Sequence, residues 1–279
     1  MALHFNVSEI VPGSIAKGVE RRSLLSRQTV PDIKLTLDCV ALSAQAELAL
    51  SVSAHDLAWF QVLEGELMLT HAAGDARLTD AHVVFLPPAF SGTLRATSRA
   101  SLLLAVVPDA AQLDPEFAAK PPGFRSVDWK NEPLLESKHD ARKRIYLATP
   151  ALFGTKAIKG EMIIYPPRTE APRHYHVGAA HFMYFLRGCG TAFAGERSFQ
   201  VKQGDLVYYS DQEEHALRGG EGEDMIFSEF FVPAGATTVW VHPEKACTWV
   251  PTGKNIKGGT PSRDIQEHSF ANPASATGV

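Results

Sequence analysis

Three histidines stand close together in the segment P-R-H-Y-H-V-G-A-A-H-F-M-Y-F-L-R-G, which runs from Pro172 to Gly188. In an extended strand, residues i and i+2 point to the same face, so His174 and His176 project together. The residues V-G-A-A then predict a turn, and His181 begins the next apolar run. Two antiparallel strands would therefore direct three imidazoles into one space.

A fourth histidine, His215, follows the charged turn S-D-Q-E-E and precedes A-L-R. Neutral imidazole binds divalent transition metals, so the four residues predict a metal site. The alternatives are a metal-free polar cluster or a vestigial site. Uncoordinated imidazoles in an interior would leave polar groups unpaired and would repel one another when protonated, which favours metal binding.

The elements that would position these residues are short strands. Runs such as W-F-Q-V-L, V-V-F-L, M-I-I-Y and L-V-Y-Y are separated by Gly, Pro, Asp and Asn, and helical periodicity is scarce. This pattern predicts an all-β fold of the sandwich or barrel type.

The strand pattern occurs twice in the same order. W-F-Q-V-L-E-G ends at Gly65 and F-M-Y-F-L-R-G ends at Gly188, an offset of 188 − 65 = 123. A-H-V-V-F-L-P-P begins at Ala81 and G-D-L-V-Y-Y-S-D begins at Gly204, and 204 − 81 is again 123. Because the offset persists across an intervening hairpin, we interpret the chain as two copies of one β-domain.

We expect an N-terminal domain over residues 1–120, a C-terminal domain over 121–246, and an arm or partly disordered tail over 247–279. The polar, Pro-rich stretch 108–133 predicts the boundary, and abundant Gly, Thr, Ser, Pro and Ala predict the tail. Residues 1–34 precede the first clear strand pattern, and we expect them to pair with the other domain or with another subunit.

The histidine segment resembles the two sequence motifs of the cupin superfamily, G-x(n)-P-x-H-x-H-x(4)-E-x(6)-G and G-D-x(9)-H. The matching positions are Gly160, Pro172, His174, His176 and Gly188 for the first motif, and Gly204, Asp205 and His215 for the second. The resemblance implies two tandem cupin-type jelly-roll β-barrels, a bicupin. It also implies one divalent transition metal per chain, with His174, His176, His181 and His215 as the metal ligands.

The chain departs from the motifs at two places. The usual glutamate ligand falls on His181, and the usual Pro-x-Gly of the second motif reads S-D-Q at 210–212. A site with four neutral imidazoles would leave the metal its full charge, which favours an anionic or enolisable substrate.

The first repeat lacks all four metal-ligand positions. Subtracting 123 from the histidine numbers gives Ser51, Ser53, Ala58 and Gly92. Since the strand pattern persists without them, we infer that the histidines serve a site that the fold itself does not need.

Imidazole ligands suit Fe, Mn, Ni, Zn and Cu without choosing among them. Four protein ligands leave positions open only on an octahedral ion, so Fe(II), Mn(II) or Ni(II) is compatible with catalysis, and Fe is favoured under the dioxygenase hypothesis. The resemblance implies, as the first hypothesis, an Fe(II)-type dioxygenase that acts on a small, anionic or enolic molecule. The alternatives are a non-redox metal-dependent lyase, isomerase or hydrolase, and a non-catalytic metal- or ligand-binding or regulatory cupin.

Side chains near the histidines suggest a pocket. Met183 and Phe185 have the same strand parity as His181, so we expect them to contact the substrate in a mostly apolar pocket. Glu229 has the parity of Phe227 and Phe231. If that face is inward, Glu229 acts as a base or orients a ligand histidine; if it is outward, Glu229 lies at a domain contact.

The chain's charge and composition favour a small-molecule substrate over a nucleic-acid or membrane partner. The net charge is −4 and no long basic run occurs. The longest aliphatic run, 102–107, is too short to cross a bilayer, and the N-terminus does not resemble a secretory signal. Three separated cysteines predict a reducing, cytoplasmic location, and apolar residues on both strand parities predict a homodimer or larger homo-oligomer.

Overall fold

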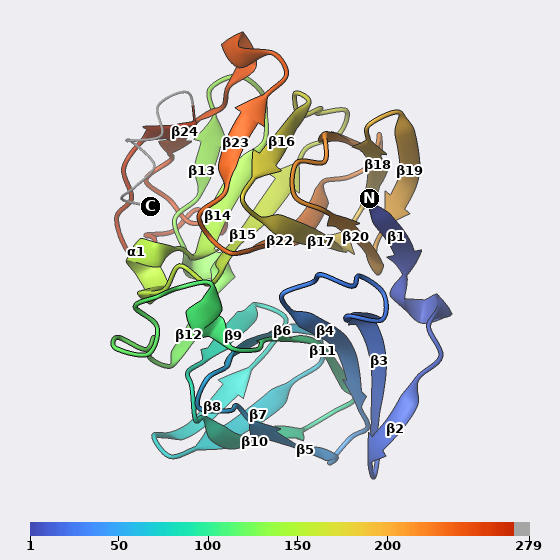
Figure 1. Ribbon diagram of the computed structural model, residues 1–279, viewed down its shortest axis with the longest axis vertical. Coiled ribbons are helices and arrows are strands. Elements are labelled where there is room, and N and C mark those ends of the chain that lie inside the picture. The colour runs from blue at the N-terminus through green and yellow to red at the C-terminus, as the bar shows by residue number, and fades with distance from the viewer. Residues whose placement is uncertain (271–279) are drawn as a thin grey trace. The chain divides into compact units, whose positions relative to one another are not determined.

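The computed structural model describes residues 1–270, which form antiparallel β-structure with very little helix (Figure 1). The chain divides into two compact units: Val7–Asp128, and Met1–Asn6 together with the chain from Trp129 onward. The second unit thus begins eight residues later than the expected start at 121, and it also includes the first six residues. Of the expected tail, residues 271–279 lie outside the described residues.

The first unit contains two antiparallel sheets. Their orders are β12-β9-β6-β11-β4-β3-β2 and β5-β10-β7-β8. The strands are β2 (Gly13–Ala16), β3 (Val19–Leu25), β4 (Thr36–Leu42), β5 (Glu47–Ser51), β6 (Leu57–Glu64), β7 (Leu67–His71), β8 (Gly74–Leu78), β9 (His82–Leu86), β10 (Ser91–Ala96), β11 (Ala100–Val107) and β12 (Arg125–Asp128), with 3₁₀ turns η1 (Val7–Glu9) and η2 (Ala110–Gln112). Aliphatic and aromatic side chains from both sheets, among them Leu69 and Phe60, form its core.

The second unit also contains two sheets. Their orders are β1-β20-β17-β22-β15-β14-β13-β24-β25 and β19-β18-β21-β16-β23. The strands are β1 (Leu3–Asn6), β13 (Leu135–Ser137), β14 (Lys143–Ala148), β15 (Lys159–Tyr165), β16 (His174–Val177), β17 (Ala180–Arg187), β18 (Cys189–Ala194), β19 (Arg197–Lys202), β20 (Asp205–Tyr209), β21 (His215–Gly219), β22 (Met225–Val232), β23 (Thr237–Trp240), β24 (Thr248–Pro251) and β25 (His268–Ser269). The helical elements are α1 (Pro150–Phe153), η3 (Trp129–Asn131) and η4 (Pro243–Lys245).

The two units repeat one topology. The order β9-β6-β11-β4-β3 in the first corresponds to β20-β17-β22-β15-β14 in the second, and β5-β10-β7-β8 corresponds to β16-β21-β18-β19. β6 begins at residue 57 and β17 at residue 180, which is the offset of 123 seen in the sequence. The predictions of an all-β fold and of two tandem jelly-roll barrels are therefore confirmed.

Gly160 shows why glycine is needed at one buried strand position. It lies in β15 opposite Phe230 of β22. A Cβ atom at Gly160 would lie 2.4 Å from Cε1 of Phe230, far inside van der Waals contact. The glycine therefore lets the aromatic ring lie against the backbone of β15.

The segments at both ends of the described chain belong to the larger sheet. β1 pairs with β20, with Leu3 opposite Tyr208. β24 pairs with β13 and carries Trp249, which is fully buried. Residues 247–270 thus supply strands and core side chains to the second unit.

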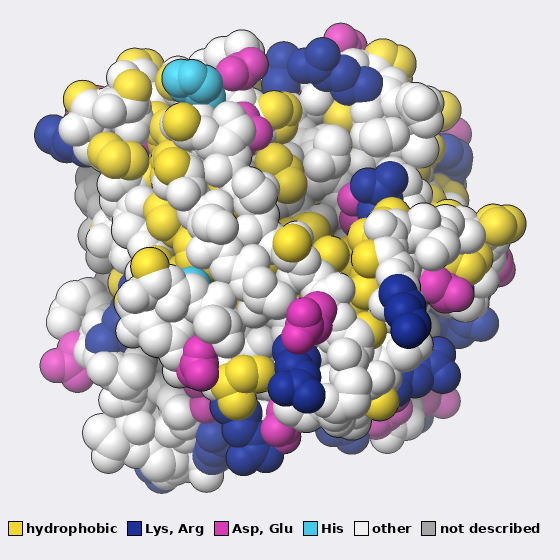
Figure 2. All heavy atoms as spheres, turned by 90° about the horizontal axis from the view of Figure 1, so that it is seen from below, with side chains coloured by type: hydrophobic (Ala, Val, Ile, Leu, Met, Phe, Trp, Pro, Cys, Tyr) yellow, Lys and Arg dark blue, Asp and Glu magenta, His cyan; other side chains and the backbone are white. Residues whose placement is uncertain are grey.

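The surface carries charges of both signs. On the face shown in Figure 2, Lys and Arg side chains are interspersed with Asp and Glu side chains and with apolar ones. Among the described residues, no helix is long and apolar enough to cross a bilayer.

Candidate metal centre

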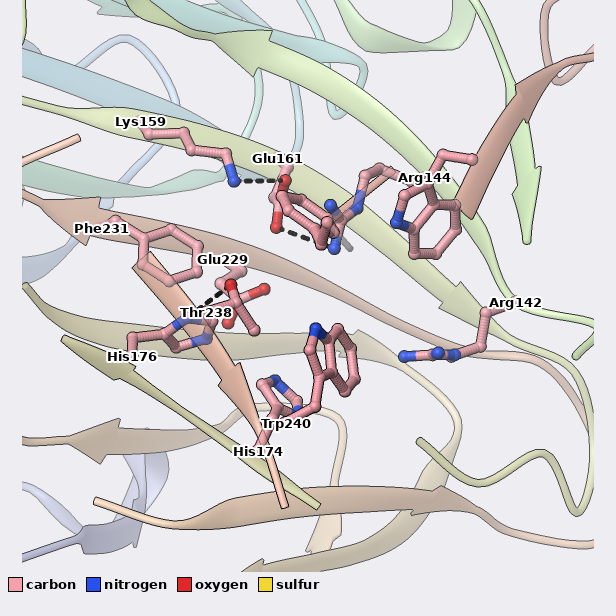
Figure 3. Close-up of a pocket in the computed structure, with 12 residues that line it drawn as sticks. Arg142, Arg144, Lys159, Glu161, His174, His176, Glu229, Phe231, Thr238 and Trp240 are labelled. Atoms are coloured by element: carbon pink, nitrogen blue, oxygen red, sulfur yellow. Dashed lines mark hydrogen bonds and ion pairs between the residues drawn. The ribbon is translucent and has the colours of Figure 1, made fainter. Parts of the chain in front are cut away.

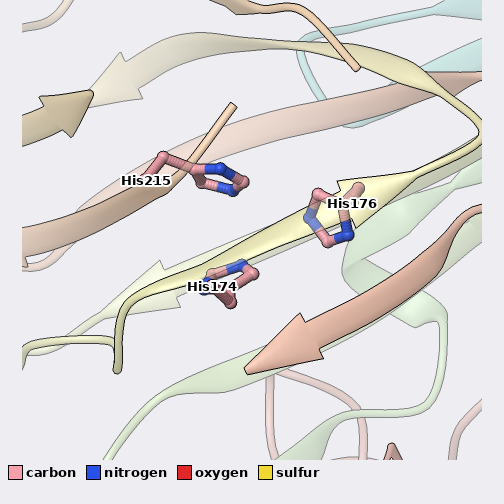
Figure 4. Close-up of side chains that lie close together, drawn as sticks. All are labelled: His174, His176 and His215. Carbon is pink, nitrogen blue, oxygen red and sulfur yellow. The ribbon is translucent and has the colours of Figure 1, made fainter. Parts of the chain in front are cut away.

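The four predicted histidines come together between the two sheets of the second unit. His174 and His176 lie on β16, and His174 is directly opposite His215 of β21. His181 lies on β17 in the other sheet. The ring centroids of His215 are 4.4, 5.1 and 4.7 Å from those of His174, His176 and His181. Figure 4 shows His174, His176 and His215 turned toward one another.

Hydrogen bonds fix the outer nitrogen of three of these rings. His174 Nδ1 lies 2.8 Å from the Pro172 carbonyl oxygen, and His215 Nδ1 lies 2.8 Å from the Glu213 carbonyl oxygen. A carbonyl only accepts, so both rings carry their proton on Nδ1 and present a lone pair on Nε2. His176 Nδ1 lies 3.1 Å from Thr238 Oγ1.

The inward nitrogens lack partners. The Nε2 atoms of His176 and His215 and both ring nitrogens of His181 are buried, and residues 1–270 offer them no hydrogen bond. Buried polar atoms are rarely left in this state, because each loses its hydration without compensation. A cation with nitrogen ligands would satisfy these atoms, so the residues present fit a bound metal.

Burial also keeps the imidazoles neutral. It lowers the pKa of His215 to about 4, and burial together with repulsion from neighbouring histidines lowers the pKa values of His174, His176 and His181 well below the usual value. Neutral rings are the form that binds metals.

A carboxylate joins the cluster from β22. Glu229 is buried, and its Oε1 lies 3.4 Å from Nε2 of His181. The donor atoms of His176, His181 and Glu229 lie within 4.8 Å of one another, as do those of His174, His176 and His215. Of the two orientations considered for Glu229, the structure has the inward one. A carboxyl group from another strand therefore lies beside the four histidines.

A second carboxylate faces the first. Glu161 of β15 is paired in register with Glu229. Burial raises the pKa of Glu229 well above its usual value, and the neighbouring Glu161 carboxylate adds to the shift. Burial would raise the pKa of Glu161 too, but Arg144 and Lys159 more than offset this and lower it. One carboxyl is thus held as the acid and the other as the anion.

A pocket of about 30 Å³ opens beside the histidines, and charged and aromatic side chains line it (Figure 3). Sequence reasoning did not identify Arg142 and Arg144 of the β14 region or Lys159 and Glu161 of β15. The sequence did contain a signal for these residues. In K-G-E-M-I-I-Y, two charged residues stand at positions i and i+2 of an apolar strand, so they share one face, which can be the inward one.

The predicted substrate contacts of Met183 and Phe185 are not found in the pocket. Both residues belong to the hydrophobic core of the barrel, packed with Val207 and Phe227. The parity was correct, but β17 leads away from His181 by about 3.4 Å per residue, so later inward residues lie deeper in the barrel. The pocket beside the histidines combines charged with aromatic side chains, where the sequence predicted a mostly apolar lining.

The first unit lacks an equivalent cluster. Across residues 1–270, both groups of three or more possible metal ligands belong to the second unit. Ala58, at the position corresponding to His181, is buried in the aliphatic core of the first barrel.

Comparisons with known proteins agree with this architecture. Residues 161–242 match the family model described as Cupin domain. Two variants of oxalate decarboxylase from Bacillus subtilis are similar in structure, with TM-scores of 0.66 and 0.67 and identities of 16% and 15%; each match covers 86% of this chain and 80% of that chain. No curated protein sequence matches the chain significantly. At such identities the structural likeness concerns the fold.

Proposed function

Because the chain carries a cupin domain and folds as a bicupin, we propose that it is a metal-dependent enzyme acting on a small, anionic or enolisable organic molecule. The observation that carries this proposal is the set of buried inward nitrogens on His176, His181 and His215 that make no hydrogen bond within residues 1–270. With His174, these residues would hold one divalent transition metal, and Glu229 is placed to join them.

A divalent ion at this position would act as a Lewis acid that polarises a substrate oxygen. The remaining tasks belong to the chain. The Pro172 and Glu213 carbonyls orient two ligand rings. The positive side chains of Arg144 and Lys159 line the pocket, where they would attract an anion.

Glu229 supports a non-redox reaction over the dioxygenase that we considered first. Its carboxyl is buried beside the histidines, and burial together with the neighbouring Glu161 raises its pKa, which favours the protonated form. A lyase, decarboxylase or isomerase needs such a proton donor when a carbanion or enolate is quenched. The structural neighbours are oxalate decarboxylases, which makes oxalate one compound to test within this class.

Oxygen dependence separates the two reaction classes. Metal-loaded protein would be incubated with short organic acids in air and under nitrogen, and oxygen uptake and product formation would be followed together. We expect turnover without oxygen uptake and with equal rates in both atmospheres. Oxygen uptake in an amount equal to the product formed, together with loss of turnover under nitrogen, would instead indicate a dioxygenase. Saturable binding without turnover of any compound would favour the binding or regulatory alternative.

The homodimer and the cytoplasmic location stay predictions from the sequence. Light scattering of the purified protein and fractionation of cells test them directly.

A further inference from the structure

The wall of the pocket beside the histidines is rich in hydrogen-bond donors without acceptors. Nε of Arg144 and the indole Nε1 atoms of Trp240 and Trp249 are buried, and none has a hydrogen-bond partner among the described residues. All three residues line the pocket. The indole of Trp240 is seen next to His174 in Figure 3, with the two ring centroids 4.8 Å apart. The donors are therefore within reach of a short molecule that also contacts the histidines.

The guanidinium of Arg144 is held firmly in this wall. Its central carbon lies 4.2 Å from the ring centroid of Trp249 and 5.1 Å from that of Phe270. Nη1 donates to the Tyr146 hydroxyl at 3.2 Å, and Nη2 is 3.4 Å from Glu161 Oε1. These four groups orient the guanidinium, while Nε stays without a hydrogen bond.

Positive charge already exceeds negative charge in the wall of the pocket before a metal is bound. Arg142 is neutralised by Asp140 at 2.7 Å. Arg144 and Lys159 share a single carboxylate, Glu161, whose oxygens lie 3.4 Å from each of them, so two positive charges face one negative charge. A divalent ion on the neutral histidines would then add two uncompensated positive charges in a buried site, which is costly unless a ligand supplies two negative ones.

From the unpartnered donors and this excess of positive charge, we infer that Arg144, Trp240 and Trp249 form a subsite for the second acid group of a compact organic dianion. The first acid group would lie at the histidine cluster. This inference rests on the proposed function for the metal, but its three residues lie outside both histidine motifs. The small volume of the pocket, about 30 Å³, restricts the ligand to a short chain.

Calorimetric titration of metal-loaded protein with malonate, acetate and adipate tests the subsite. We expect malonate to bind at least tenfold more tightly than acetate, and adipate to bind no better than acetate. Arg144→Gln should weaken malonate binding at least tenfold, weaken acetate binding much less, and leave metal content unchanged. Trp240→Phe keeps the ring but loses the N–H group, and should weaken malonate binding severalfold. Arg187→Gln, at an exposed arginine, is the matched control and should bind malonate like the wild type.

Metal content, measured on each sample, separates the two proposals. Full metal content without a preference for malonate overturns the subsite and leaves the metal site standing. A different result is possible in protein that takes up no metal. If this protein prefers malonate to acetate and Arg144→Gln removes the preference, the subsite is supported and the proposed function is overturned. If circular dichroism shows that Arg144→Gln does not fold, Trp240→Phe becomes the test of the subsite. Malonate binding equal to that of the wild type in Trp240→Phe then overturns the subsite.

Discussion

Glu229 and His181 face one another on neighbouring strands β22 and β17, with 3.4 Å between Oε1 of the carboxyl and Nε2 of the imidazole. His181 stands at the motif position where cupins usually carry a glutamate. The carboxyl group missing from that position is thus supplied from the adjacent strand, so the site contains four histidines and a carboxyl.

Replacing His176 should remove the metal. His176 belongs to both groups of possible ligands, so His176→Ala breaks each of them. We expect about one metal per chain in the wild type and a loss of roughly 100-fold or more in affinity in the variant. Elemental analysis after dialysis measures this. His55→Ala, at an exposed histidine of the first unit, is the control and should retain full metal. Full metal in His176→Ala would refute the ligand assignment.

Glu229→Gln tests the role of the carboxyl. The amide keeps the shape but can neither ionise nor donate an acidic proton. We expect metal affinity to fall about 10- to 100-fold, less than for His176→Ala, because the histidines remain. Turnover should fall more than metal occupancy when the metal is saturating. Competition with a fluorescent chelator measures the affinity, and an unchanged value together with unchanged turnover would show that Glu229 only fills space.

Acid should destabilise the metal-free protein. The folded state holds the pKa of His215 at about 4 against its usual 6.5, so between these values the unfolded chain binds a proton that the folded chain does not. Stability must then fall as the pH falls through this window. The shift corresponds to ~3 kcal/mol for His215 alone. Urea midpoints of chelator-treated protein at neutral and mildly acidic pH measure the effect, and His215→Gln should flatten the dependence. Midpoints that rise on acidification would contradict it.

Gly160→Ala should destabilise the second unit. The added methyl group would overlap the ring of Phe230, which costs about 1–3 kcal/mol when a packed interior must shift. Urea unfolding measures the loss, and Phe230→Leu in the same chain should restore part of it. Gly235→Ala, where a Cβ meets open space, is the control. Equal stability of Gly160→Ala and the wild type would show that the ring moves freely.

The fold could be predicted from the sequence because strand periodicity and the constant offset of 123 are local signals that the barrels preserve. His174, His176 and His181 could be predicted for the same reason, since they lie on the consecutive strands β16 and β17; His215 on β21 was predicted from the second motif. The charged wall could not. Arg144, Glu161 and Glu229 meet only because β14, β15 and β22 are neighbours in the sheet, and the sequence alone does not specify strand order.

Met183 and Phe185 show a second limit of prediction from the sequence. Alternation identifies which side chains face inward, but an inward face includes both the pocket and the core below it. Trp249 shows a third limit, which concerns composition. Residues 247–270 have the composition of a tail, yet the buried indole of Trp249 and the pairing of β24 with β13 attach them to the sheet.

The pairing of β1 with β20 has a consequence for the order in which the protein is made. His4 contacts Asp205 across 201 residues, so at ~5–20 residues per second the ribosome adds the partner strand roughly 10–40 s after the first one. The chain of the first barrel, Val7–Asp128, is complete long before then. The barrel with the histidines is therefore the last to close, and a fragment that starts at Trp129 would leave β20 with an unpaired edge that invites aggregation.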